Sequence, residues 1–80
     1  MDIQKLIYFC ITKLVDSPEA VAINNKGTAE KAIYEISVAP HDLARVIGKE
    51  GRTFKALRAL ITLVDPEHVQ DIVLDTSANT

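Results

Sequence analysis

Apolar residues near the amino terminus recur with the spacing of one face of an α-helix. They fall at steps of three and four residues from position 3 to position 14, with polar residues between them. Pro18 disfavours helical geometry at Ser17 and has no amide hydrogen, so we expect the helix to end before it. The predicted apolar face consists of Ile3, Leu6, Ile7, Cys10, Ile11 and Leu14.

Two stretches typical of β-strands follow. Residues 21–23 form a short apolar run, and residues 31–38 alternate between two faces with a period of two. Residues 24–27, with the sequence Asn-Asn-Lys-Gly, supply residue types that tolerate positive φ in a turn. The pattern therefore predicts a β-hairpin whose second arm has Ala32, Tyr34, Ile36 and Val38 on one face.

The second half of the chain predicts two helices and a last strand. Asp42 stands where a carboxylate can cap a helix of about two turns at residues 43–47, which Gly48 ends. A longer helical pattern follows Gly51 and stops at Asp65-Pro66, and an apolar run at residues 72–74 predicts a strand. The core face of the longer helix is predicted to hold Phe54, Leu57, Ile61 and Val64.

The predicted order α-β-β-α-α-β fills one small domain at residues 1–76, and we expect a flexible tail at residues 77–80. The single cysteine, Cys10, cannot form an internal disulfide and lies on an apolar helix face. No apolar run approaches the ~20 residues that span a bilayer. We expect a cytoplasmic protein without membrane insertion.

The charge of the chain is unevenly distributed. Eighty residues carry a formal net charge of −2, which by itself disfavours nucleic-acid binding. Residues 45–58, however, hold five cations and the single anion Glu50, a local charge of +4 that leaves −6 elsewhere. Arg52, Lys55 and Arg58 share one sector of the predicted helix, so a basic face lies beside the segment Gly48-Lys49-Glu50-Gly51.

That four-residue segment is a GxxG loop between two helices. We expect Gly48 to take the left-handed conformation that ends a helix, and Gly51 to let another backbone approach closely. The helix that begins near Arg52 presents unpaired N–H groups and its positive dipole end, and both favour an anion such as phosphate. The loop is therefore predicted to bind an anion.

The element order and this loop together resemble a KH domain of the bacterial, type II topology. Over nearly its whole length the chain resembles the KhpA (YlqC-like) family of small bacterial KH-domain RNA-binding proteins. The matching segments are the opening helix, Leu14-Val15-Asp16-Ser17-Pro18, Val38-Ala39-Pro40-His41-Asp42-Leu43, Val46-Ile47-Gly48-Lys49-Glu50-Gly51-Arg52 and Ala56-Leu57-Arg58.

The resemblance implies an α+β fold with a three-stranded sheet packed on one side by three helices. It also implies binding of about four nucleotides of single-stranded RNA in a groove beside the loop. Val46 and Ile47 are candidates for the groove floor. The expected role is that of a post-transcriptional regulator or RNA chaperone. The expected RNA-binding residues are Arg45, Ile47, Gly48, Lys49, Glu50, Gly51, Arg52, Lys55 and Arg58.

Other functions are less well supported by the residues. The spacing around Gly48-Lys49 does not fit a nucleoside triphosphatase loop, and His41 and His68 are too few for a zinc site, so we expect no catalysis, cofactor or metal. The alternative is a KH-fold protein-interaction module. The family is linked to self-association and to pairing with a larger KH-domain RNA-binding protein, so a homodimer and a heterodimer are both open. Apolar residues outside the core face, Ala56, Ala59, Leu60 and Leu63, favour the dimer.

Overall fold

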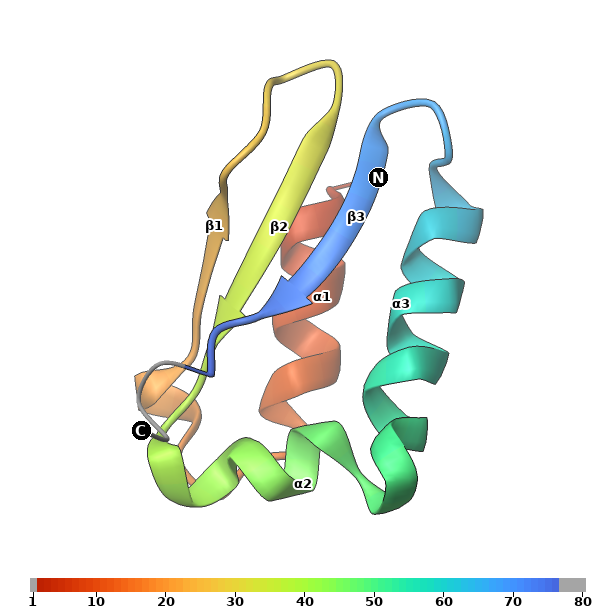
Figure 1. Ribbon diagram of the computed structural model, residues 1–80. Helices are drawn as coiled ribbons and strands as arrows, with labels where there is room; N and C mark the ends of the chain where they lie inside the picture. Colours follow the sequence, from red (N-terminus) through yellow and green to blue (C-terminus); the bar gives the residue numbers. More distant parts are fainter. Residues whose placement is uncertain (1, 77–80) are drawn as a thin grey trace.

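The computed structural model describes residues 2–76 and has the predicted element order (Figure 1). Short 3₁₀ turns precede β1, α2 and α3, and the predicted tail at 77–80 lies outside the described residues. The prediction of an α+β fold is confirmed. The helices and strands are α1 (Ile3–Thr12), β1 (Ala22–Asn25), β2 (Ala32–Ser37), α2 (Leu43–Ile47), α3 (Arg52–Val64) and β3 (Val69–Leu74).

The three strands form one mixed sheet in the order β1-β2-β3. β1 pairs antiparallel with β2, placing Ile23 opposite Ile36, whereas β3 pairs parallel with β2, placing Ile72 opposite Tyr34. A parallel neighbour requires a crossover connection, and α2, the GxxG loop and α3 make it. The candidate loop therefore lies within the crossover between two paired strands.

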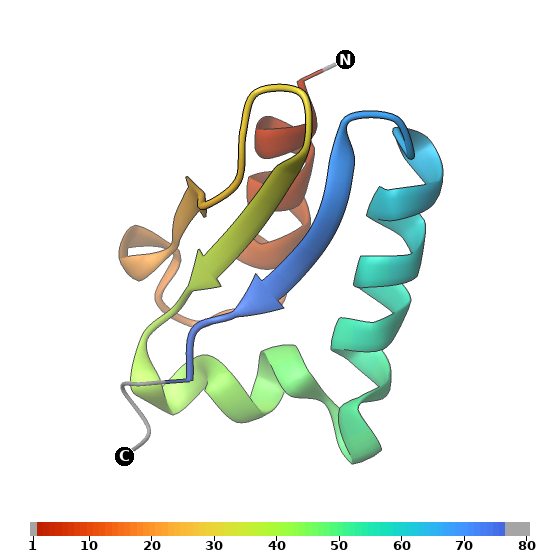
Figure 2. The same cartoon turned by 45° about the horizontal axis from the view of Figure 1, so that its top comes forward.

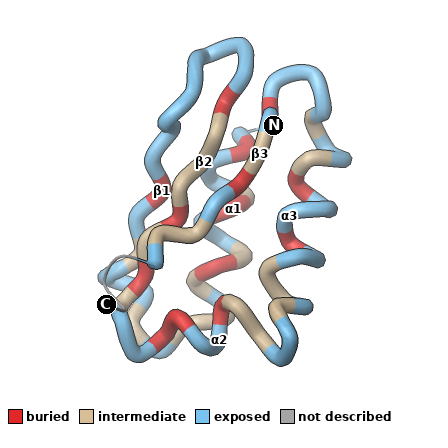
Figure 3. The backbone as a smooth tube through the Cα atoms, viewed as in Figure 1, coloured by how far each residue is buried: buried red, intermediate tan, exposed pale blue. Residues whose placement is uncertain are grey.

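The core lies between one face of the sheet and the helices (Figure 3). Ile7 and Ile11 of α1, Ile36 of β2 and Ile61 of α3 are completely buried. Residues of the other sheet face, such as Asn24 and Val73, are exposed, as alternation along a strand with one covered face requires. Within residues 2–76 no helix is long and apolar enough to cross a membrane.

Element boundaries differ from the sequence prediction where backbone pairing extends a strand. β1 runs through Asn25, because the Asn25 side-chain oxygen accepts hydrogen bonds from the Gly27 and Ile33 amides and so anchors a longer connection. β3 begins at Val69 rather than Ile72, since Val69 pairs with Ala32. The extension of β3 follows from pairing between segments distant in sequence, which local patterning does not reveal.

The buried face of α3 is shorter along the helix than the sequence predicted. Leu57 and Ile61 are buried and Phe54 is half-buried, as the apolar pattern indicates. Val64, assigned to the same face, is instead 43% exposed at the last turn. The helix ends there, beyond the part that packs on the sheet.

Candidate nucleic-acid interface

The GxxG segment forms a tight turn between α2 and α3 at one end of the molecule, far from the amino-terminal end of α1 (Figures 1 and 2). Gly48 has φ 77° and ψ 175°, Glu50 has φ 59° and Gly51 has φ 75°. Lys49, Glu50 and the half-buried Gly51 make one 3₁₀ turn that leads directly into α3. Three positive φ values in four residues turn the chain sharply from α2 into α3 (Figure 1).

The two glycines exchange the roles that the sequence predicted. Gly51, not Gly48, has the left-handed helical conformation, with ψ 13°. Gly48, not Gly51, is the position of close approach, because a Cβ there would lie 2.9 Å from the Thr53 amide nitrogen and closer still to the Thr53 side chain. A Cβ at Gly51 would meet only the Lys55 side chain, at 3.7 Å. The prediction was wrong in these roles because sequence spacing does not reveal which glycine Thr53 packs against.

The first turn of α3 is available to an anion. Gly51 precedes the helix and provides no side-chain hydrogen bond to its amides, and no acidic residue lies in the first turn. Lys49 and Lys55 are exposed, and neither forms an ion pair with any residue between 2 and 76. Free cations beside an uncapped helix start fit a phosphate group.

The three arginines of the predicted site are already paired with carboxylates. Arg52 contacts Glu50 at 3.1 Å, Arg45 contacts Asp16 at 3.0 Å, and Arg58 contacts Asp71 at 2.7 Å. Arg58 thereby lies against β3, and Arg45 lies against the connection between α1 and β1. The structure brings Arg52 together with the loop, and directs Arg45 and Arg58 to acidic partners outside it.

Val46 and Ile47, the candidates for an apolar groove floor, differ in exposure. Val46 is completely buried in the core, so it cannot contact a ligand, and that expectation was wrong. Ile47, the last residue of α2, is half-buried and borders Gly48. Of the two, Ile47 alone offers apolar surface next to the loop.

Asp42 has a different role from the predicted helix cap. Its carboxylate makes no capping hydrogen bond to α2. It is completely buried and accepts hydrogen bonds from the Asp16 amide at 3.0 Å and the Ser17 amide at 3.1 Å. Arg45 lies 3.9 Å away, and His41 contacts both Asp42 and the Ser17 hydroxyl. Asp42 therefore connects the start of α2 to the segment after α1.

These contacts change the acidity of Asp42. The hydrogen bond from the Asp16 amide is the largest cause of a lowered pKa for this carboxyl. Burial opposes it, while the Ser17 amide and the charges of His41 and Arg45 add to the lowering of the pKa. Sequence reasoning missed this connection, because a carboxylate just before a helix has the same local pattern whether it caps the helix or reaches another segment.

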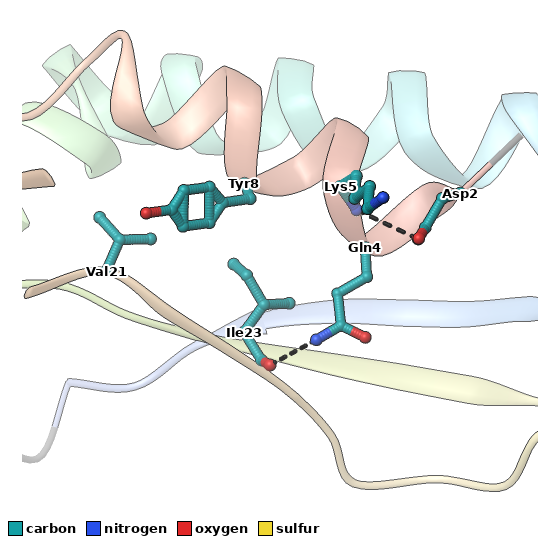
Figure 4. A pocket seen from close by; sticks show the side chains of 6 residues that line it. All are labelled: Asp2, Gln4, Lys5, Tyr8, Val21 and Ile23. Atoms are coloured by element: carbon teal, nitrogen blue, oxygen red, sulfur yellow. Dashed lines mark hydrogen bonds between the residues drawn. The ribbon is translucent and has the colours of Figure 1, made fainter. Parts of the chain in front are cut away.

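A separate hollow of about 430 Å³ lies between the first turns of helix α1 and the start of strand β1 (Figure 4). Tyr8, Val21 and Ile23 supply its apolar wall, and the Gln4 amide donates a hydrogen bond to the Ile23 carbonyl at 2.9 Å. None of the predicted RNA-binding residues lines it. It is therefore distinct from the GxxG surface.

Comparison with known proteins gives a consistent result. The family model for the KH domain of KhpA/KhpB matches residues 4–75. The RNA-binding protein KhpA of Listeria monocytogenes is 39% identical over 72 residues, which cover 90% of this chain and 95% of the relative. Its namesake in Chlamydia pneumoniae is 44% identical over 61 residues, covering 76% and 78%. No solved structure matches the chain.

These similarities cover the fold and the candidate site together. The matched residues include α2, the GxxG loop, α3 and the Asp42 contacts. The curated relatives are named as RNA-binding proteins, which agrees with the prediction of a non-catalytic protein. The resemblance stated from the sequence is confirmed, and the chain belongs to the KhpA/KhpB family of KH domains.

Proposed function

We propose that this protein binds single-stranded RNA at the GxxG surface, defined as Ile47, Gly48, Lys49, Glu50, Gly51, Arg52 and Lys55. The observation that carries the proposal is the uncapped start of α3 directly beside Lys49 and Lys55, which form no ion pair within residues 2–76. The names of the curated relatives support RNA as the ligand. The cellular role that we propose is post-transcriptional regulation or RNA chaperoning in the cytoplasm.

Phosphates would lie along the backbone from Gly48 to Gly51. Gly51 adds no Cβ on this path, whereas Thr53 fills the corresponding space at Gly48, so a phosphate can approach the main chain closely at Gly51. Lys49 is exposed in the loop, and Lys55 follows one turn into α3. Phe54 is half-buried and contacts the core, so we expect backbone contacts rather than stacking of bases on aromatic rings. Arg45 and Arg58 are expected to add positive potential from a distance.

Reversing the loop charge tests this site. The double variant Lys49→Asp with Glu50→Asp should abolish binding to a short fluorescein-labelled oligouridylate in fluorescence anisotropy. Aspartate tolerates the left-handed conformation at position 50, so helical circular dichroism and Tm should remain close to wild type. The matched control is Lys31→Asp with Glu30→Asp, the same pair of changes in the exposed β1–β2 connection, which should leave binding unchanged.

Salt dependence gives a second readout of the same proposal. With two or three phosphates neutralised, the plot of log affinity against log salt should have a slope of about −1.5 to −2.5. Unaltered binding in the loop variant, or binding that salt does not weaken, would contradict the site assignment.

A second candidate function is protein association through the exposed apolar face of α3. Leu60 is 51% exposed and Leu63 is 81% exposed, and Ala56, Ala59 and Val64 extend this surface. On the helical wheel Ala56, Ala59, Leu60 and Leu63 lie apart from the core-facing Leu57 and Ile61. Val64 lies beside Leu57 on the wheel and continues the exposed surface at the last turn. We propose that this face, called the α3 apolar face below, binds a second copy of the chain or a larger KH-domain RNA-binding protein. Association would not need the GxxG surface.

A further inference from the structure

Glu50 combines two unusual features within the GxxG loop. It is the one non-glycine residue with positive φ between residues 2 and 76, at 59°. Such a conformation is disfavoured for a residue with a Cβ, and it is found disproportionately at functional positions. In addition, its carboxylate accepts a hydrogen bond from the Arg52 guanidinium at 3.1 Å. A negatively charged side chain therefore lies where the proposed ligand is itself negative.

The Glu50–Arg52 contact depends on the shape of the loop. Side chains two residues apart in a regular helix point to different sides and do not meet. Here the left-handed conformations of Glu50 and Gly51 lie between α2 and α3 and bring the two side chains together. The strained backbone and the ion pair are thus two parts of one local arrangement.

From this arrangement we propose that Glu50 is an internal competitor for phosphate, occupying Arg52 until RNA displaces it. The inference rests on the proposed RNA-binding function and identifies how the same surface is regulated. Arg52 is the first residue of α3, directly after the loop, so its guanidinium is close to the proposed phosphate path. In the free protein, the charge of Arg52 is neutralised by Glu50.

The exposure of both side chains makes the exchange possible. The Arg52 side chain is 74% exposed and that of Glu50 is 64% exposed, so solvent and a phosphate can reach the pair. Exposed ion pairs contribute little to stability, and a bidentate phosphate contact with arginine can replace this one. By contrast, Asp71, the partner of Arg58, has a side chain that is only 32% exposed. It also accepts a hydrogen bond from the Ile72 amide, so the Arg58–Asp71 pair is held more firmly.

An internal competitor makes binding more selective. A ligand that offers one loosely placed phosphate must displace Glu50 with that single contact. A strand that also reaches Lys49 and the start of α3 gains further contacts for the same displacement. We therefore expect wild-type protein to discriminate between single-stranded RNA and an unstructured polyanion, such as polyphosphate, more strongly than a Glu50 variant does.

Replacing the carboxylate by an amide tests the competition. Glu50→Gln should tighten binding to the labelled oligouridylate by about two- to fivefold. The salt slope should change little, because RNA contacts the same phosphates in both proteins once Glu50 has been displaced. The matched control, Glu67→Gln, makes the same charge change at an exposed position between α3 and β3 and should leave the affinity unchanged. Glutamine has the same backbone preference as glutamate, so Tm should be preserved.

A double-mutant cycle separates release of Arg52 from general charge repulsion. If Glu50 occupies Arg52, Arg52→Gln should weaken binding more in the Glu50→Gln background than in wild type. Additive effects, or equal affinities for Glu50→Gln and wild type, would overturn the inference while leaving RNA binding intact. Wild-type protein that binds no RNA would instead overturn the proposed function itself.

Discussion

At the scale of single residues, Asp42 has the most consequential contacts outside the loop. Its lowered pKa means that folding favours the ionised carboxylate. The resulting stabilisation is complete above the ordinary pKa, near 3.8, and disappears as pH falls through the lower folded-state pKa. Asp42→Asn should therefore lower Tm at neutral pH, and the difference from wild type should shrink below pH 3.8, as measured by thermal melting across pH.

Asp16, whose backbone amide donates to Asp42, provides the control for the Asp42→Asn prediction. Asp16→Asn makes the same change in a side chain that is 63% exposed and, among the described residues 2–76, forms an ion pair with Arg45 alone, so it should lower Tm much less. If the Tm of Asp42→Asn stays below that of wild type by the same amount down to the lowest pH, the asparagine side chain destabilises the fold for steric reasons. In that case the charge of Asp42 would not be the source of the stability.

The sequence predicted which residues form the loop more readily than which residues they contact. The sequence placed Gly48, Lys49, Gly51 and Arg52 in one loop, because their spacing is local information. It could not assign the close approach of Gly48 to Thr53, which depends on the angle between α2 and α3. The contact of Asp42 with the Asp16 and Ser17 amides is likewise set by packing across the fold.

At the scale of elements, α3 presents three surfaces with different chemistry. One packs on the core through Leu57 and Ile61, one is the α3 apolar face, and one carries Arg52, Lys55 and Arg58. Apolar periodicity predicted the first, because burial against a sheet is what the 3.6-residue period reports. It assigned Val64 wrongly, since periodicity does not reveal where the sheet stops supporting the helix.

The cations on the basic surface of α3 are expected to contribute unequally to RNA affinity. Lys55 is unpaired among residues 2–76, whereas the Arg58 guanidinium makes two hydrogen bonds to Asp71, at 2.7 and 3.4 Å. Lys55→Gln should weaken oligouridylate binding by about two- to fivefold, and Arg58→Gln by less than about twofold. Arg58→Gln should lower Tm more than Lys55→Gln does. Equal losses of affinity would show that Arg58 leaves Asp71 when RNA binds.

At the scale of the whole molecule, the α3 apolar face and the GxxG surface share no residue. A domain of this size has a small core, here built from isoleucine, valine and leucine side chains, so a subunit contact would add useful stability. We expect wild-type protein to sediment as a dimer at micromolar concentration in analytical ultracentrifugation. Leu60→Glu should give a monomer, because a charge buried at such a contact is strongly unfavourable.

The control for the dimer is a glutamate elsewhere on the surface. Val73→Glu changes an exposed apolar residue on the uncovered face of the sheet, and this variant should remain dimeric. A wild-type monomer would refute association between copies. RNA binding by the Leu60→Glu variant at wild-type affinity would show that the two surfaces act independently.

The parallel pairing of β2 with β3 also has a consequence for synthesis on the ribosome. The crossover that contains the GxxG loop is closed only when β3, the last strand, has joined the sheet. α3 packs against that strand, so a nascent chain lacking β3 also lacks the support that orients its first turn. Contacts between segments far apart along the chain form late in folding. We therefore expect the proposed RNA-binding loop to become fully ordered only once β3 has joined the sheet.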